Sequence, residues 1–167
     1  MVGEGGRDPV RFDYALDGAG WATATATVGG REVAMTVSYL HDSLGQLADA
    51  ILELEAGREE AVTVFMSEPG EHHLVFRRSG DTVAVEARWF KDWASWGMYP
   101  PDRYEVLAAG TSPFAVVREQ VVAALGRVLA EHGVEGYKAK WVEHEFPVSA
   151  HERLKHAKPG AAADGGM

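Results

Sequence analysis

A run of aromatic side chains in the second half of the chain is the feature of this 167-residue sequence with the clearest binding chemistry. Tryptophan and tyrosine are enriched at binding hot spots, because they desolvate a large area at a low cost in side-chain entropy. Asp92 and Asp102 lie within the run and would supply a polar rim. The run predicts a partner-binding surface, a cap over an open end of the core, or the lid of a pocket. Its members are Trp89, Phe90, Trp93, Trp96, Tyr99 and Tyr104.

Acidic residues precede this run. The turn Glu68-Pro69-Gly70-Glu71 presents two carboxylates, and Glu59 and Glu60 follow a predicted helix. If these four side chains converge in the fold with Glu53 and Glu55 of that helix end, they form one acidic patch. Such a patch would bind Arg or Lys side chains of a partner through charge-assisted hydrogen bonds.

Other chemistries have little support in the sequence. The chain has no cysteine, so thiol catalysis, disulfides and Cys-ligated metals are excluded. His72 and His73 are adjacent and would point to opposite faces of a strand. His151 and His156 are five residues apart, whereas a helical metal motif needs histidines four apart. No phosphate-binding loop or serine-nucleophile elbow occurs. We therefore expect no metal, no cofactor and no catalytic residue, although carboxylates that converge only in space leave an enzyme open.

The formal net charge of −9 indicates the kind of partner. Residues 1–70 contain 12 acidic and 4 basic residues, whereas residues 71–167 contain 13 and 12. An acidic protein repels phosphate backbones and anionic lipids, so we expect neither a nucleic acid nor a membrane as partner. A basic protein partner would be attracted and steered. The simpler alternative is that the charge only keeps the protein soluble.

Hydrophobic periodicity and turn residues predict the elements that must position these side chains. Ser43 and Gln46 have the spacing of a capping box, and Ser112 followed by Pro113 is typical of a helix start. Gly133 would end the second helix. The predicted order is strands at 12–16, 21–28 and 33–39, a helix at 43–54, and strands at 61–67, around 74–76 and at 82–90. An irregular segment at 91–111, a helix at 112–132, a strand at 137–146 and a short helix from 149 follow.

This order predicts an α+β fold, with an antiparallel sheet of about six to seven strands in β-β-β-α-β-β-β-α-β-α order. Two main helices would cover one face of the sheet. We expect one domain at 9–158, with disordered glycine-rich ends at 1–8 and 159–167. The sequence has no apolar run near the ~18–20 residues that span a bilayer and no apolar stretch of a secretory signal. We therefore expect a cytoplasmic protein.

Short stretches of the chain resemble small uncharacterised proteins of actinobacteria. They lie at residues 12–16, 20–21, 38–44 and 68–71, within roughly residues 10–90. In size, acidity and α+β organisation the chain is also similar to immunity proteins of bacterial toxin systems. This second resemblance implies a protein that binds a protein partner. Neither resemblance assigns an activity to any residue.

Together these observations favour a non-enzymatic acidic binding module of immunity or adaptor type, which neutralises or docks a basic protein partner. One alternative is a binder of small apolar ligands, or a cavity enzyme, with its pocket between the 112–132 helix and the sheet. Another is a homodimer formed through the aromatic run or a 137–146 edge strand. The residues we expect at the partner surface are Trp93, Trp96, Tyr99, Tyr104, Asp92, Asp102, Glu68, Glu71, Glu59 and Glu60.

Overall fold

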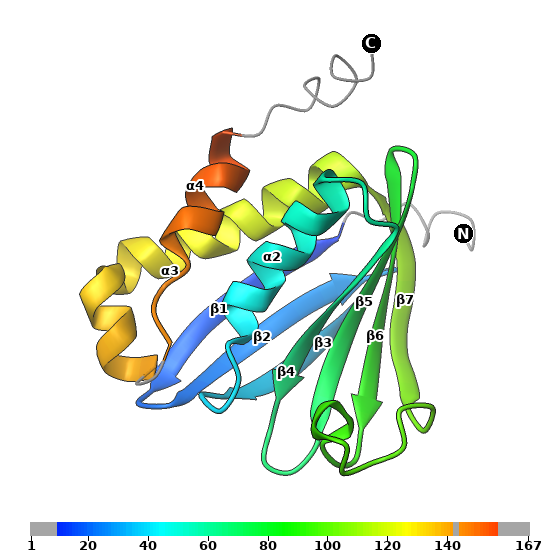
Figure 1. Ribbon diagram of the computed structural model, residues 1–167, viewed down its shortest axis with the longest axis horizontal. Coiled ribbons are helices and arrows are strands. Elements are labelled where there is room, and N and C mark those ends of the chain that lie inside the picture. The colour runs from blue at the N-terminus through cyan, green and yellow to red at the C-terminus, as the bar shows by residue number, and fades with distance from the viewer. Residues whose placement is uncertain (1–9, 142–143, 157–167) are drawn as a thin grey trace.

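The computed structural model describes residues 10–141 and 144–156 and contains two antiparallel sheets (Figure 1). The predicted disordered ends, residues 1–8 and 159–167, lie outside the described residues. The first sheet has the order β1-β2-β3 and the second has the order β4-β5-β6-β7. The elements are β1 (Arg11–Gly18), β2 (Trp21–Val28), β3 (Arg31–Ser38), α2 (Ser43–Glu55), β4 (Glu60–Met66), β5 (Glu71–Ser79), β6 (Thr82–Phe90), η1 (Ala94–Trp96), β7 (Glu105–Pro113), α3 (Phe114–Trp141) and α4 (Val148–His156).

The predicted α+β class, the antiparallel pairing and the strand number are confirmed. The strands form two sheets rather than one, and the last strand precedes the long helix instead of following it. Segment 91–111, which we predicted to be irregular, contains this strand, β7. Its register with β6 shifts at Ala87/Arg88, and its residues 108–112 are small. The shift breaks the alternation on which the prediction depended. Ser112, which we predicted to cap the helix, is instead buried near the end of β7.

The predicted strand at 137–146 is wrong. Gly133 has the non-helical angles φ 69° and ψ 172°, so the first helical segment of α3 ends there as predicted, and a second helical segment continues to Trp141. Tyr137 and Trp141 are four residues apart, so they lie on one face of the helix, and both are fully buried. A homodimer formed through a 137–146 edge strand is therefore not supported, because residues 137–141 are helical.

One core joins both sheets and the helices. Phe12 on β1 and Phe76 on β5 meet edge to face, with ring centroids 6.2 Å apart. Ile51 on α2 and Leu125 on α3 are fully buried in the same cluster. Among the described residues, no helix combines the length and apolar character needed to cross a membrane.

Side chains of α2 form hydrogen bonds with the backbone along the unpaired edge of β4. Ser43 Oγ donates to the Val64 carbonyl at 2.6 Å, and Gln46 Oε1 accepts from the Val64 N–H at 2.7 Å and from His41 Nε2 at 2.7 Å. The predicted capping box is therefore wrong, because both residues serve the neighbouring strand. The helix cap is instead Asp42, whose Oδ1 accepts from the Gly45 N–H at 3.1 Å.

Two other edge strands, β1 and β7, also receive side-chain hydrogen bonds. On β1, the Phe12 N–H donates to Gln120 Oε1 at 3.2 Å and its carbonyl accepts from Arg127 Nη2 at 2.9 Å, both from α3. On β7, Arg31 Nη1 donates to the Leu107 carbonyl at 3.1 Å. Covered edges disfavour pairing between copies of the chain.

Arg78 on β5 offsets an electrostatic cost at the end of α2. Glu53 and Glu55 lie near this helix C-terminus, where negative charge opposes the helix dipole. Arg78 Nη1 donates to the Leu54 carbonyl at 2.9 Å, and its guanidinium lies 4.0 Å from the centre of the Phe114 ring. The positive charge of Arg78 therefore lies at the C-terminus of α2, where a cation stabilises the helix dipole.

Replacing this cation should destabilise the fold. We expect Arg78→Met to lower the free energy of unfolding by about 1–3 kcal/mol, because a charge-assisted hydrogen bond at the helix end is lost. Urea unfolding measures this change. Arg77→Met is the matched control, since Arg77 is exposed and pairs with exposed Glu60. Equal midpoints for the two variants would contradict the capping role of Arg78.

Candidate partner-binding surface

The middle strands of the second sheet place the residues of the site. Glu71 and His73 on β5 point to the same face of the sheet and pair with Phe90 and Arg88 on β6. After Phe90 the chain leaves the sheet, forms η1 and returns as β7 (Figure 1). We call residues 91–104 the aromatic loop. The contacts described next bring it back against the β4–β5 turn.

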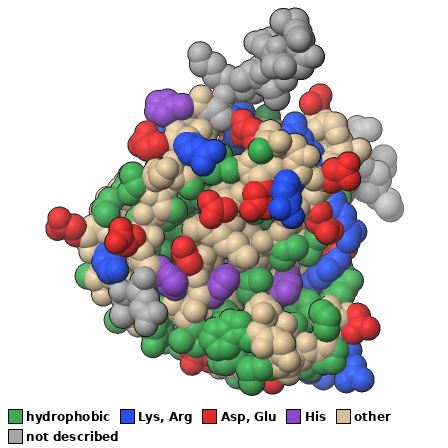
Figure 2. Space-filling view, viewed as in Figure 1, with side chains coloured by type: hydrophobic (Ala, Val, Ile, Leu, Met, Phe, Trp, Pro, Cys, Tyr) green, Lys and Arg blue, Asp and Glu red, His purple; other side chains and the backbone are tan. Residues whose placement is uncertain are grey.

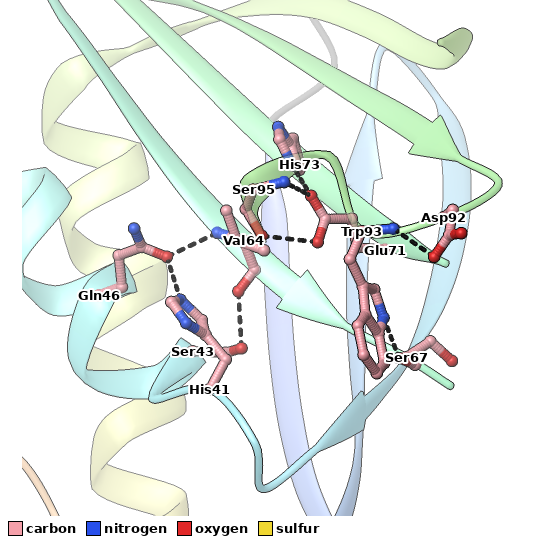
Figure 3. A network of polar contacts seen from close by, with 10 residues as sticks. All are labelled: His41, Ser43, Gln46, Val64, Ser67, Glu71, His73, Asp92, Trp93 and Ser95. Atoms are coloured by element: carbon pink, nitrogen blue, oxygen red, sulfur yellow. Dashed lines mark hydrogen bonds and ion pairs between the residues drawn. The ribbon is translucent and has the colours of Figure 1, made fainter. Parts of the chain in front are cut away.

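A buried carboxylate clamps the aromatic loop to the sheet (Figure 3). Glu71 is fully buried. Its Oε1 accepts from Ser95 Oγ at 2.8 Å, and its Oε2 accepts from the Ser95 N–H at 2.9 Å and from His73 Nε2 at 2.6 Å. Burial alone would raise the pKa of Glu71, but the hydrogen bonds from His73 and Ser95 outweigh it and hold that pKa below its usual value. The side chain therefore serves as an ionised anchor for the loop.

Ser95, His73 and Glu71 are residue types found in hydrolytic triads, but their connections differ. In a triad the histidine lies between the serine and the acid, so that it can take the serine proton. Here the carboxylate lies between the other two, and its lowered pKa makes it a weak base. This arrangement suits a structural clamp better than acyl transfer.

Two tryptophans form the first half of the loop. Trp93 is half-buried, its indole Nε1 donates to the Ser67 carbonyl at 2.7 Å, and its N–H donates to Asp92 Oδ1 at 2.8 Å. Trp96 packs edge-on against Trp93, with ring centroids 4.9 Å apart. Trp93 therefore holds the loop to the β4–β5 turn and supports the more exposed Trp96.

The second half of the loop is held by Tyr104. The guanidinium of Arg88 lies 4.2 Å from the centre of the Tyr104 ring, and Arg88 Nε donates to Glu86 Oε2 at 2.6 Å. Phe90 packs beside Tyr104 at a centroid distance of 5.5 Å. The loop is thus fastened at Trp93, at Ser95 and at Tyr104.

The fastened loop and the start of β7 leave several large apolar side chains in solvent. The exposed fractions are 51% for Trp96, 56% for Met98, 38% for Tyr104 and 48% for Val106. We call these four residues the aromatic surface. Figure 2 shows hydrophobic side chains gathered along the lower margin of the molecule, the end at which Figure 1 places the loop. Exposed apolar clusters of this kind mark interaction sites.

The predicted acidic residues do not form one patch. Glu68 is exposed beside the loop and accepts from Ser38 Oγ at 2.6 Å. Asp102 is exposed and Tyr99 is half-buried in the loop itself. Glu71 points inward, so its contribution to a surface is indirect.

Glu59 and Glu60 lie away from this cluster. Glu60 begins β4 and Glu68 follows its end, so the strand separates them by roughly 20 Å at ~3.3 Å per residue. Glu60 also pairs with Arg77 at 2.7 Å. These two acids therefore belong to the opposite end of the second sheet.

Comparisons with known proteins add a single weak likeness. No family model matches the chain, and no curated protein matches it. A chain of a CdiA-CT/CdiI toxin and immunity complex from Enterobacter cloacae has a similar structure, with a TM-score of 0.44 and 6% sequence identity. The alignment covers 70% of this chain and 97% of that chain. A likeness at this level supports no conclusion about function.

Sequence reasoning named Trp93, Tyr104 and Glu71 but missed their partners His73, Arg88 and Ser95. His73 and Glu71 are two apart on a strand and share a face, a signal that was present in the sequence. Ser95 and Arg88 carried no such signal, because their contacts with Glu71 and Tyr104 arise only when the loop folds back.

Proposed function

We propose that the protein is a non-enzymatic protein-binding module of immunity or adaptor type, which docks or neutralises a basic protein partner through the aromatic surface. The observation that carries this proposal is the exposure of three large apolar side chains on a loop fastened at three points, with Val106 exposed just after it on β7. A loop that is already ordered loses little conformational entropy on binding, so more of its contact energy becomes affinity. An exposed tryptophan on such a loop fits the role of a hot spot.

Exposed carboxylates near the aromatic surface support a basic partner. Glu68, Asp102 and Glu105 are exposed there beside Lys91 and Arg103, and the whole chain carries −9. These carboxylates would form a rim that steers a cationic partner and loses strength as salt rises.

The alternative site for a small apolar ligand has less support. The face of α3 that looks toward the sheets is filled by buried side chains, among them Val117, Val121 and Leu125. A groove of about 520 Å³ beside α3 is lined largely by polar and charged residues such as Asp13 and Arg127. Neither feature suits an apolar ligand.

A capture experiment with surface variants tests the proposal. The full chain is immobilised and exposed to a lysate of its own host cells at low and at high salt. Trp96→Ser with Met98→Ser removes half of the aromatic surface, and the matched control is Val134→Ser with Val148→Ser, two exposed apolar residues on helices. We expect a basic protein to be retained by the wild type and the control, to be released by high salt, and to be lost with the loop variant.

The proposal is wrong if the loop variant retains the same proteins as the control. Circular dichroism of both variants shows that any loss of retention does not come from unfolding.

A further inference from the structure

A groove opens beside the aromatic surface. Its volume is about 370 Å³, and its walls come from the end of β6, the aromatic loop and the start of β7. Three rings line it, those of Trp89, Tyr99 and Tyr104, together with the carboxylates of Asp102 and Glu105. Lys91 and Arg103 complete the lining.

The indole wall of this groove is held in place. Trp89 lies so close over Gly70 that a Cβ at that position would overlap the indole. The His72 ring packs against the Trp89 indole, with ring centroids 4.7 Å apart. Gly70 also has φ 88°, a conformation that L side chains rarely adopt. The groove is therefore formed before any partner arrives.

One ring of the groove, that of Tyr104, already contacts a cation of the chain. At the edge of the groove, Arg88 lies over Tyr104 while Glu86 accepts a hydrogen bond from the same guanidinium. Aromatic faces carry a negative quadrupole, so they attract cations and repel anions. Among the described residues, Asp102 and Glu105 have no ion-pair partner, so two carboxylates remain for an incoming cation.

We propose that this groove takes an arginine side chain of the protein partner, with the guanidinium over the rings and near Asp102 and Glu105. This inference rests on the proposed function and deepens it, since it names the chemistry that the partner presents. Lys91 and Arg103 also line the groove and would suit a carboxylate instead. The two carboxylates balance these two cations, and the three rings favour the cation.

A titration with short peptides tests the inference without the partner. Acetyl-Gly-Arg-Gly-amide is added to the full-length ¹⁵N-labelled protein, and the indole N–H signal of Trp89 is followed by NMR. Acetyl-Gly-Glu-Gly-amide is the comparison probe. We expect the arginine peptide to shift the Trp89 signal in a saturable way and the glutamate peptide to leave it in place.

Charge-matched variants locate the effect. Asp102→Asn with Glu105→Gln should raise the half-saturation concentration about fivefold, the range of exposed ion pairs. Glu32→Gln with Glu119→Gln removes the same net charge at exposed positions elsewhere and should leave the titration unchanged. The inference is overturned if the glutamate peptide shifts Trp89 as strongly, if the arginine peptide does not shift it, or if both variants behave alike. Retention of a partner that depends on Trp96 would survive each of these results, so the two proposals fail separately.

Discussion

Glu71→Gln is expected to lower the free energy of unfolding by about 2–4 kcal/mol and to release the aromatic loop. The substitution keeps the volume but removes the charge that accepts hydrogen bonds from Ser95 and His73. The substitution also replaces one carboxylate oxygen by an amide NH₂, which cannot accept the hydrogen bonds that Ser95 or His73 donates to that oxygen. Urea unfolding measures the loss, and amide hydrogen exchange at Ser95 reports the release of the loop.

The pH dependence of this effect has a definite sign. The pKa of Glu71 in the folded protein lies below the ordinary 4.5. The folded state thus favours the ionised form, and its contribution is complete above the unfolded pKa and is lost as pH falls through the folded pKa. The stability gap between the wild type and Glu71→Gln should therefore be largest near neutral pH and should narrow below about pH 4.

Glu68→Gln is the matched control, because it removes a carboxylate from the same turn at an exposed position. We expect it to change the free energy of unfolding much less than Glu71→Gln does. Equal losses for the two variants, or a gap that widens in acid, would contradict the clamp.

Gly70→Ala should have the second large effect, a loss of about 2–4 kcal/mol in the free energy of unfolding. The new methyl group would overlap the Trp89 indole, and the positive φ of Gly70 adds backbone strain. Thermal unfolding measures the loss, and the Trp89 indole N–H signal should move because the ring is displaced.

Gly80→Ala separates the two causes. Gly80 also has a positive φ, 62°, but a Cβ there meets no atom within 4 Å. It should show only the backbone cost, on the order of 1 kcal/mol. A similar loss for both variants would mean that Trp89 adjusts freely and that the groove wall is not fixed.

Local patterns were sufficient for most of the fold. Alternating Phe12 and Tyr14, the threonines of β2 and the Gly29-Gly30 turn predicted the first sheet. Prediction failed where the local pattern was broken. The register shift at Ala87/Arg88 hid β7, and the residues after the kink at Gly133 form a helical segment where a strand was predicted.

The candidate surface was partly predictable for similar reasons. The spacing of Trp93, Trp96 and Tyr104 marked the loop before its position was known. The role of Glu71 could not be read from the turn in which it occurs, because the side chain that it holds, Ser95, is 24 residues further on. Contacts over such separations are set by the folded chain and leave no periodicity in the sequence.

Photo-cross-linking from position 96 tests most directly that the aromatic loop is the partner-binding surface. Benzoylphenylalanine replaces Trp96 in one sample and the exposed Val134 of α3 in another, and both are irradiated in host cells. We predict that a basic protein cross-links from position 96 and not from position 134. Cross-links to a protein from position 134 alone, or none from position 96, would contradict a binding role for this loop.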